Sequence, residues 1–177
     1  MDGDGRSGEI RRLADELARR AKELGLMIGV AESLTSGRIA AAIGASEGAS
    51  EWFCGGVVAY VDDVKFRVLG VRRGPVISDE CAREMADGAK RLLGADVALG
   101  VTGVGGPGEA EGKPAGTVFI ATSYGGRTEG EEHHFSGSPD DVLEKTIAKS
   151  IDLVLRTVPA PASARPIPLR EPGGMTG

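Results

Sequence analysis

Two serines, a tyrosine and a lysine are the residues of this chain whose types suit nucleophilic chemistry. Ser33 follows an apolar run, Ser50 lies in a Gly/Ser-rich stretch, and Tyr60 stands five residues before Lys65. A lysine in a partly desolvated site beside a tyrosine can lose its proton and act as base for a serine nucleophile, without any histidine. Each serine can equally be a cap or turn residue, so the spacing alone does not choose the nucleophile.

The segment AESLTSGR, residues 31–38, places an acid and three hydroxyls where a buried strand should end and a helix should begin. We expect Thr35 or Ser36 to cap this helix, because hydroxyl oxygens accept hydrogen bonds from the free N–H groups of a first turn. Glu32, Ser33 and Thr35 are then candidates for one wall of a composite pocket.

The loop GVGGPGEAEGKPAGTV, residues 103–118, holds six glycines in sixteen residues and connects two apolar strands. It is not a dinucleotide-binding loop, because EAEGKP follows where a helix is required, and it is not a P-loop, because Pro107 and Pro114 occupy required positions. Backbone N–H groups of such a loop can still form an anion-binding nest. We expect a ligand-binding loop, with a flexible connection as the alternative; the candidate binding residues are Thr102, Gly103, Gly105 and Gly106.

Neither the histidines nor the cysteines suggest a metal site. His133 and His134 are adjacent on an expected strand, so their side chains point to opposite faces. Cys54 and Cys81 have no metal-ligand or disulfide spacing, which is typical of reduced thiols in a cytoplasmic protein. We therefore expect no metal and no cofactor.

The length suits a single domain of ordinary size, and the charge limits the classes of partner. The chain has 177 residues and a formal net charge of −5, which argues against a general nucleic-acid binder. No apolar run approaches the roughly 18 residues of a membrane span, and no signal peptide is visible, so we expect a soluble cytoplasmic protein.

Hydrophobic periodicity and capping signals predict helices alternating with strands early in the chain, then two adjacent strands and a last helix. This order predicts a single-domain α/β fold, a three-layer α/β/α sandwich with a mixed sheet. We expect the domain over 9–157, with disordered tails at 1–8 and at the Pro/Gly-rich 158–177. The expected helices cover 10–24, 37–43, 62–69, 78–93 and 138–157, and the expected strands 26–30, 57–60, 97–101, 118–122 and 129–135.

From about Glu9 to Thr157, the chain resembles the nicotinamide-mononucleotide amidohydrolases of the CinA C-terminal-domain type. The resemblance rests on AESLTSG, GASEWFCGGVVAYVDDVK, LGV, EMADGA, ADVALGVTGVGGPG, KPAGTVFIA and HFSG, in the family's order and spacing. It implies hydrolysis of the nicotinamide amide to nicotinate mononucleotide and ammonia, in pyridine-nucleotide salvage, without a cofactor. It also implies a stand-alone form of the domain, a small-molecule nucleotide substrate and a homodimer or higher oligomer.

The resemblance carries the family's Ser/Tyr/Lys set onto Ser50, Tyr60 and Lys65, with further hydroxyls on Ser33 and Thr102. It favours Ser50 narrowly as the nucleophile and Ser33 as a wall or oxyanion donor, and the reverse assignment remains open. Trp52 and the following Phe53 are candidates for an interface or pocket, or else they pack the loop onto the core.

Three departures from the family pattern bear on the substrate. Ser36 replaces a glycine, Val61 and Asp62 replace Ser-Asn, and Pro139 and Leu143 stand where the family has arginines. Arginines are natural partners of phosphate and carboxylate, so their loss affects the expected grip on a nucleotide.

Two alternatives follow from these departures. The chain can be a catalytically weak or inactive nucleotide-binding module, or an amidase for another small amide that lacks the 5′-phosphate. Arg38, next to the AESLTSG motif, is a candidate to replace the missing arginines.

Overall fold

The computed structural model describes residues 3–160 of the chain. It contains five α-helices, one 3₁₀ helix and five strands within these residues. The helices are α1 (Gly3–Leu24), α2 (Arg38–Gly44), η1 (Ala49–Glu51), α3 (Asp62–Val68), α4 (Asp79–Leu93) and α5 (Pro139–Thr157), and the strands are β1 (Ile28–Glu32), β2 (Phe53–Val58), β3 (Val97–Gly103), β4 (Thr117–Tyr124) and β5 (Arg127–His134).

The five strands form one mixed sheet in the order β2-β1-β3-β4-β5. β1 is parallel to both β2 and β3, whereas β4 is antiparallel to β3 and β5. The carboxyl ends of the three parallel strands therefore meet at one edge of the sheet. The loop between β3 and β4 lies at this edge too, because Gly103 pairs with Val118.

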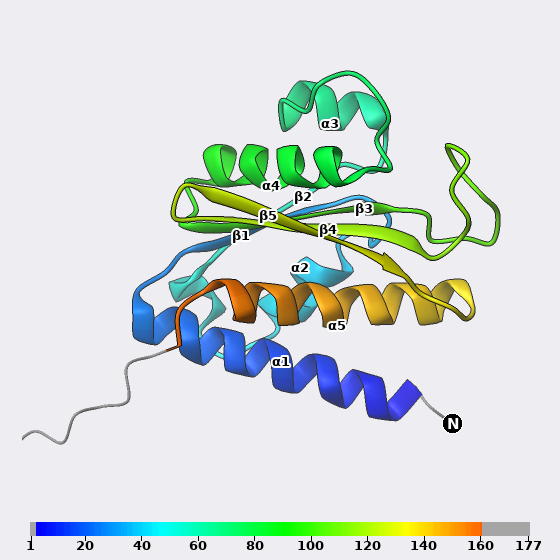
Figure 1. The fold of residues 1–177 in the computed structure, drawn as a ribbon. Coiled ribbons are helices and arrows are strands. Elements are labelled where there is room, and N and C mark those ends of the chain that lie inside the picture. Colours follow the sequence, from blue (N-terminus) through cyan, green and yellow to red (C-terminus); the bar gives the residue numbers. More distant parts are fainter. Residues whose placement is uncertain (1–2, 161–177) are drawn as a thin grey trace, which may run out of the picture.

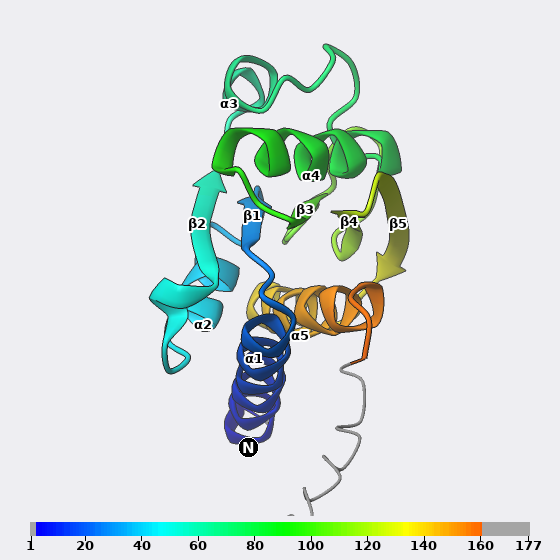
Figure 2. The same cartoon turned by 90° about the vertical axis from the view of Figure 1, so that its left-hand side faces the viewer.

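The sheet is the middle of three layers, as the sequence predicts. α4 covers one face, with α3 beyond it, and α1, α2 and α5 cover the other (Figures 1 and 2). Each face has its own apolar cluster, one including Leu17, Ile39 and Ile151 and the other Met85 and Ala86. Trp52 is 1% exposed within the first cluster, so the core-packing alternative for this residue is confirmed.

The two long helices after the first begin where capping chemistry places them. The Ser78 side chain accepts a hydrogen bond from the Cys81 amide, and Ser138 forms a capping box with Asp141. Pro139 occupies the first turn of α5, where its missing N–H has no consequence.

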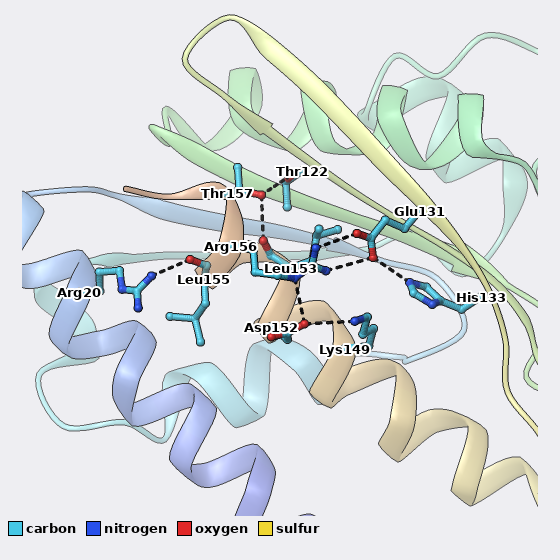
Figure 3. Close-up of polar contacts among 10 residues, drawn as sticks. All are labelled: Arg20, Thr122, Glu131, His133, Lys149, Asp152, Leu153, Leu155, Arg156 and Thr157. Carbon is cyan, nitrogen blue, oxygen red and sulfur yellow. Dashed lines mark hydrogen bonds and ion pairs between the residues drawn. The ribbon is translucent and has the colours of Figure 1, made fainter. Parts of the chain in front are cut away.

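Polar contacts fasten α5 to the sheet and to α1 (Figure 3). Arg156 binds both carboxylate oxygens of Glu131 on β5, at 2.9 and 3.1 Å, and Arg20 of α1 donates to the Leu155 carbonyl at 2.7 Å. Glu131 also contacts His133 at 3.2 Å. Burial lowers the pKa of His133. His134 is on the other face of the strand and far more exposed, as expected from the alternation.

The predicted tail at residues 1–8 is wrong for its described part, because α1 begins at Gly3. Arg6 anchors this first turn to α5 through Asp141 at 2.7 Å and Glu144 at 3.4 Å. The expected C-terminal tail falls mostly on 161–177, outside the described residues. Strand β2 starts four residues earlier than predicted, because Phe53 already pairs with Ile28 of β1.

Among residues 3–160, no helix combines the length and apolarity that a membrane crossing requires.

Candidate active site

A cavity of about 410 Å³ opens at the sheet edge where the parallel strands end. This is the place where open α/β sheets usually bind ligands. Its walls come from the segments after β1, β2 and β3, from residues 76–77 before α4 and from the start of α5. The lining residues are Ser33, Leu34, Tyr60, Asp62, Lys65, Val76, Ile77, Thr102, Gly103, Val104, Gly105, Gly106, Gly108, Glu109, Ala110, Pro139 and Leu143.

Lys65 supplies the cavity's amine. Helix α3 turns this side chain inward, so that it is 1% exposed, and its Nζ donates to the Tyr60 carbonyl at 3.3 Å and to Asp62 Oδ1 at 3.2 Å. Val61 occupies the cap position of α3, and Asp62 is the first residue of the helix. Burial raises the pKa of the nearby Cys81 thiol to about 12, although the positive charge of Lys65 opposes the effect. The thiol is therefore a neutral neighbour of the lysine.

Ser33 and Tyr60 face the same cavity as Lys65. Ser33 follows β1 directly, and its amide donates to the Val101 carbonyl of β3 at 3.1 Å, which fixes its backbone at the sheet edge. Tyr60 follows β2 and is 64% exposed. The structure thus brings together three of the four residues that the sequence singled out for chemistry.

The Gly-rich loop forms the facing wall and is held by two contacts that the sequence analysis missed. Thr102 donates its hydroxyl to the Val76 carbonyl at 2.7 Å. Glu111 accepts the amides of Val76 and Ile77 at 3.1 and 2.9 Å. The Thr102 hydroxyl therefore positions the cavity wall, and Glu111 was hidden because its partners lie 34 and 35 residues away.

Gly103, Gly105 and Gly106 line the cavity as expected. Within the described chain, the N–H groups of Gly105 and Gly106 donate no hydrogen bond to protein. These amides are available to a ligand oxygen. Gly116 closes the loop, with φ of 89°, and a side chain there would strike the Phe135 carbonyl.

Glu32 and Thr35 do not line the cavity, contrary to expectation. The fully buried Glu32 carboxylate accepts the amides of Gly37, Ile39 and Ala40 at 3.1, 3.0 and 2.8 Å. It therefore caps α2 from the strand, so the prediction that Thr35 or Ser36 caps this helix is wrong. Gly37 occupies the cap position itself, without a side-chain hydrogen bond.

Ser50 lies outside the cavity and at the other edge of the sheet. It belongs to η1, which precedes β2, whereas Tyr60 and Lys65 follow β2. Figure 2 shows β2 pointing toward α3. A strand of six residues spans roughly 20 Å, so Ser50 and Lys65 of one chain do not meet. The expectation that Ser50, Tyr60 and Lys65 form one catalytic set within a single chain is therefore wrong, because Ser50 precedes β2 and the other two residues follow it.

Arg38 also stays outside the cavity lining. Its guanidinium pairs with Asp140 at 3.5 Å and is about half exposed. Pro139 and Leu143, which stand where the resemblance places arginines, form part of the cavity wall.

Comparison with known protein families identifies the family of the chain, because the model of the CinA C-terminal domain matches residues 10–158. The chain belongs to the CinA C-terminal domain family. Its relatives include a CinA-like protein of Geobacter metallireducens, 37% identical over 156 residues, which cover 85% of this chain and 38% of the relative. This CinA domain spans little more than a third of the length of the curated relatives it matches first.

Solved structures agree with this membership. The CinA domain is similar to a competence-damaged protein (CinA) superfamily protein from Escherichia coli, with a TM-score of 0.82, 32% identity and coverage of 84% of this chain and 90% of that one. A superfamily member from Enterobacter cloacae gives a TM-score of 0.81 at 34% identity, covering 84% and 91% of the two chains.

Proposed function

We propose that this CinA domain is a serine amidase that hydrolyses the carboxamide of a nicotinamide nucleotide to the carboxylate and ammonia. The observation that carries the proposal is the placement of Ser33, Tyr60 and Lys65 around one cavity, opposite a glycine loop with free amides. The resemblance of the motifs to nicotinamide-mononucleotide amidohydrolases supplies the substrate class.

Ser33 is the nucleophile in this proposal. Its Oγ attacks the carboxamide carbon while Lys65, as the general base, takes the hydroxyl proton and passes it to the departing nitrogen. Ammonia leaves, and an ester joins the substrate's acyl group to Ser33. Water then attacks this ester, which releases the carboxylate and restores the Ser33 hydroxyl.

The cavity supplies the remaining parts of such a mechanism. The amides of Gly105 and Gly106 are candidate donors to the oxyanion that forms on the carboxamide oxygen. Tyr60 lines the same cavity, so its phenol is a candidate to share the proton's path. The carbonyl of Tyr60 also holds Lys65 in place, so one residue contributes both position and chemistry.

Ammonia release from nicotinamide mononucleotide, followed with the pure protein and its Lys65→Ala variant, tests the proposal. Release by the unaltered protein, with at least a hundredfold loss in the variant, is the result expected for loss of a general base. No release above that of the variant, from either the mononucleotide or nicotinamide riboside, would refute an amidase. Ligand binding without release would instead favour the alternative from the sequence, a nucleotide-binding module without turnover.

A further inference from the structure

The cavity has an acidic charge balance. Of its lining residues only Lys65 is cationic, while Asp62 and Glu109 are acidic. Lys65 is already paired with Asp62 at 3.2 Å. Glu109 lies in the exposed part of the glycine loop, so its charge remains at the cavity mouth.

The wall formed by α5 offers no replacement cation. Pro139 and Leu143 are apolar. Arg38, on the neighbouring α2, does not line the cavity and pairs with Asp140 at 3.5 Å. More of the lining side chains are apolar than charged, and the apolar ones include Leu34, Val76, Ile77, Val104, Pro139 and Leu143.

We infer that this site prefers a carboxamide substrate without a phosphate group, a cationic pyridinium nucleoside rather than its mononucleotide. The inference rests on the proposed function for the identity of the carboxamide. A pyridinium nucleoside carries one positive charge. Its mononucleotide adds a phosphate of nearly two negative charges at neutral pH, which reverses the net sign.

Two features of the site act in the same direction. The Glu109 carboxylate at the mouth, which has no paired cation among the lining residues, attracts the pyridinium and repels the phosphate. The apolar wall gives a phosphate none of the charge-assisted hydrogen bonds that normally hold it. Such a wall contacts the sugar and ring of a nucleoside equally well.

The test is calorimetry on the Ser33→Ala variant, which keeps the cavity but does not consume the ligand. The probes are nicotinamide riboside and nicotinamide mononucleotide at low ionic strength. We expect the riboside to bind roughly three- to tenfold tighter, as one exposed carboxylate and the lack of a phosphate partner allow. A ratio below twofold, tighter binding of the mononucleotide, or no binding of either probe overturns the inference.

Three further variants link the ratio to named residues. Glu109→Gln should reduce the preference for the riboside to less than half its original value. Leu143→Arg should reverse it in favour of the mononucleotide while riboside affinity stays within twofold. Leu92→Arg, on α4 and 53% exposed, is the matched control and should leave the ratio unchanged. Retention of the preference in both Glu109→Gln and Leu143→Arg contradicts the inference.

Turnover separates this inference from the proposed function. If the unaltered protein binds the riboside more tightly but hydrolyses neither probe, the amidase proposal fails and the inference stands. If it hydrolyses both probes but binds the mononucleotide more tightly, the amidase proposal stands and the inference fails.

Discussion

The Nζ atom of Lys65 lies 3.2 Å from Asp62 Oδ1, yet the two side chains have opposite environments, 1% and 56% exposed. The lysine is held inside the cavity while its counter-ion stays in contact with water. Removal of the lysine therefore leaves Asp62 hydrated rather than stranded, so the chemistry of Lys65 can be tested without a large loss of stability.

Replacement of Lys65 by Met should abolish activity and preserve the fold. Methionine fills the same buried space but carries no base, so ammonia release should fall by about a thousandfold, within the usual range for a general base. The melting temperature should stay within about 4 °C of the unaltered protein, which corresponds to about 1 kcal/mol for a chain of this size.

Lys22→Met is the control for this substitution, because Lys22 is an exposed lysine of α1 outside the cavity. It should change neither property. Activity of Lys65→Met within tenfold of the unaltered protein contradicts the role of Lys65 as the base.

Replacement of Glu32 by Gln should destabilise the protein without affecting catalysis. The glutamine side chain lacks the negative charge to which three backbone N–H groups at the start of α2 donate. Its own N–H₂ group also points toward one of these donors. We expect a loss of about 2–3 kcal/mol in the free energy of unfolding, measured with urea, because hydrogen bonds to charged groups are strong.

Glu47→Gln, an exposed change near α2, serves as the control and should be neutral. The KM of Glu32→Gln should stay unchanged at temperatures where the variant is folded. A tenfold rise in KM would restore the substrate-binding role that the structure does not support.

Replacement of Asp141 by Asn should lower the melting temperature in a pH-dependent way. A hydrogen bond from Arg6, with smaller contributions from Ser138, holds the pKa of Asp141 well below its ordinary range. The stability from this depressed pKa is present above the unfolded value of about 4 and is lost as the pH falls toward the folded value. The difference from the unaltered protein should therefore be largest near pH 6 and shrink below pH 4.

Asp140→Asn, one residue earlier and 86% side-chain exposed, is the comparison and should show little pH-dependent difference. An Asp141→Asn difference that is constant from pH 3 to pH 7 would contradict the assigned cause.

The layers and the two long helices after α1 could be predicted because their signals are local. Ser78 and Ser138 mark helix starts within three residues, and the apolar periodicity marks the buried faces. Residues 3–8 were assigned to a tail because their composition is polar. Within this segment Arg6 contacts Asp141 across 135 residues, and no local pattern shows such a contact.

The cavity could be predicted in part. Tyr60, Lys65 and the glycine loop follow parallel strands, and the carboxyl ends of such strands converge. Ser50 precedes β2 in the sequence, which places it at the opposite end of this strand from Tyr60. The motif resemblance nevertheless favours one set that contains both residues. The cap formed by Glu32 was missed because a carboxylate five to eight residues before its partners lies outside the usual capping pattern.

The choice between the two serines is the central claim, and a direct comparison of Ser33→Ala with Ser50→Ala tests it. Ammonia release from nicotinamide riboside and from nicotinamide mononucleotide should be measured for both variants and the unaltered protein. We predict that Ser33→Ala loses at least a thousandfold of the activity, as for removal of a catalytic nucleophile. Ser50→Ala should remain within threefold of the unaltered protein. Loss of activity in Ser50→Ala, with activity retained in Ser33→Ala, would contradict the assignment.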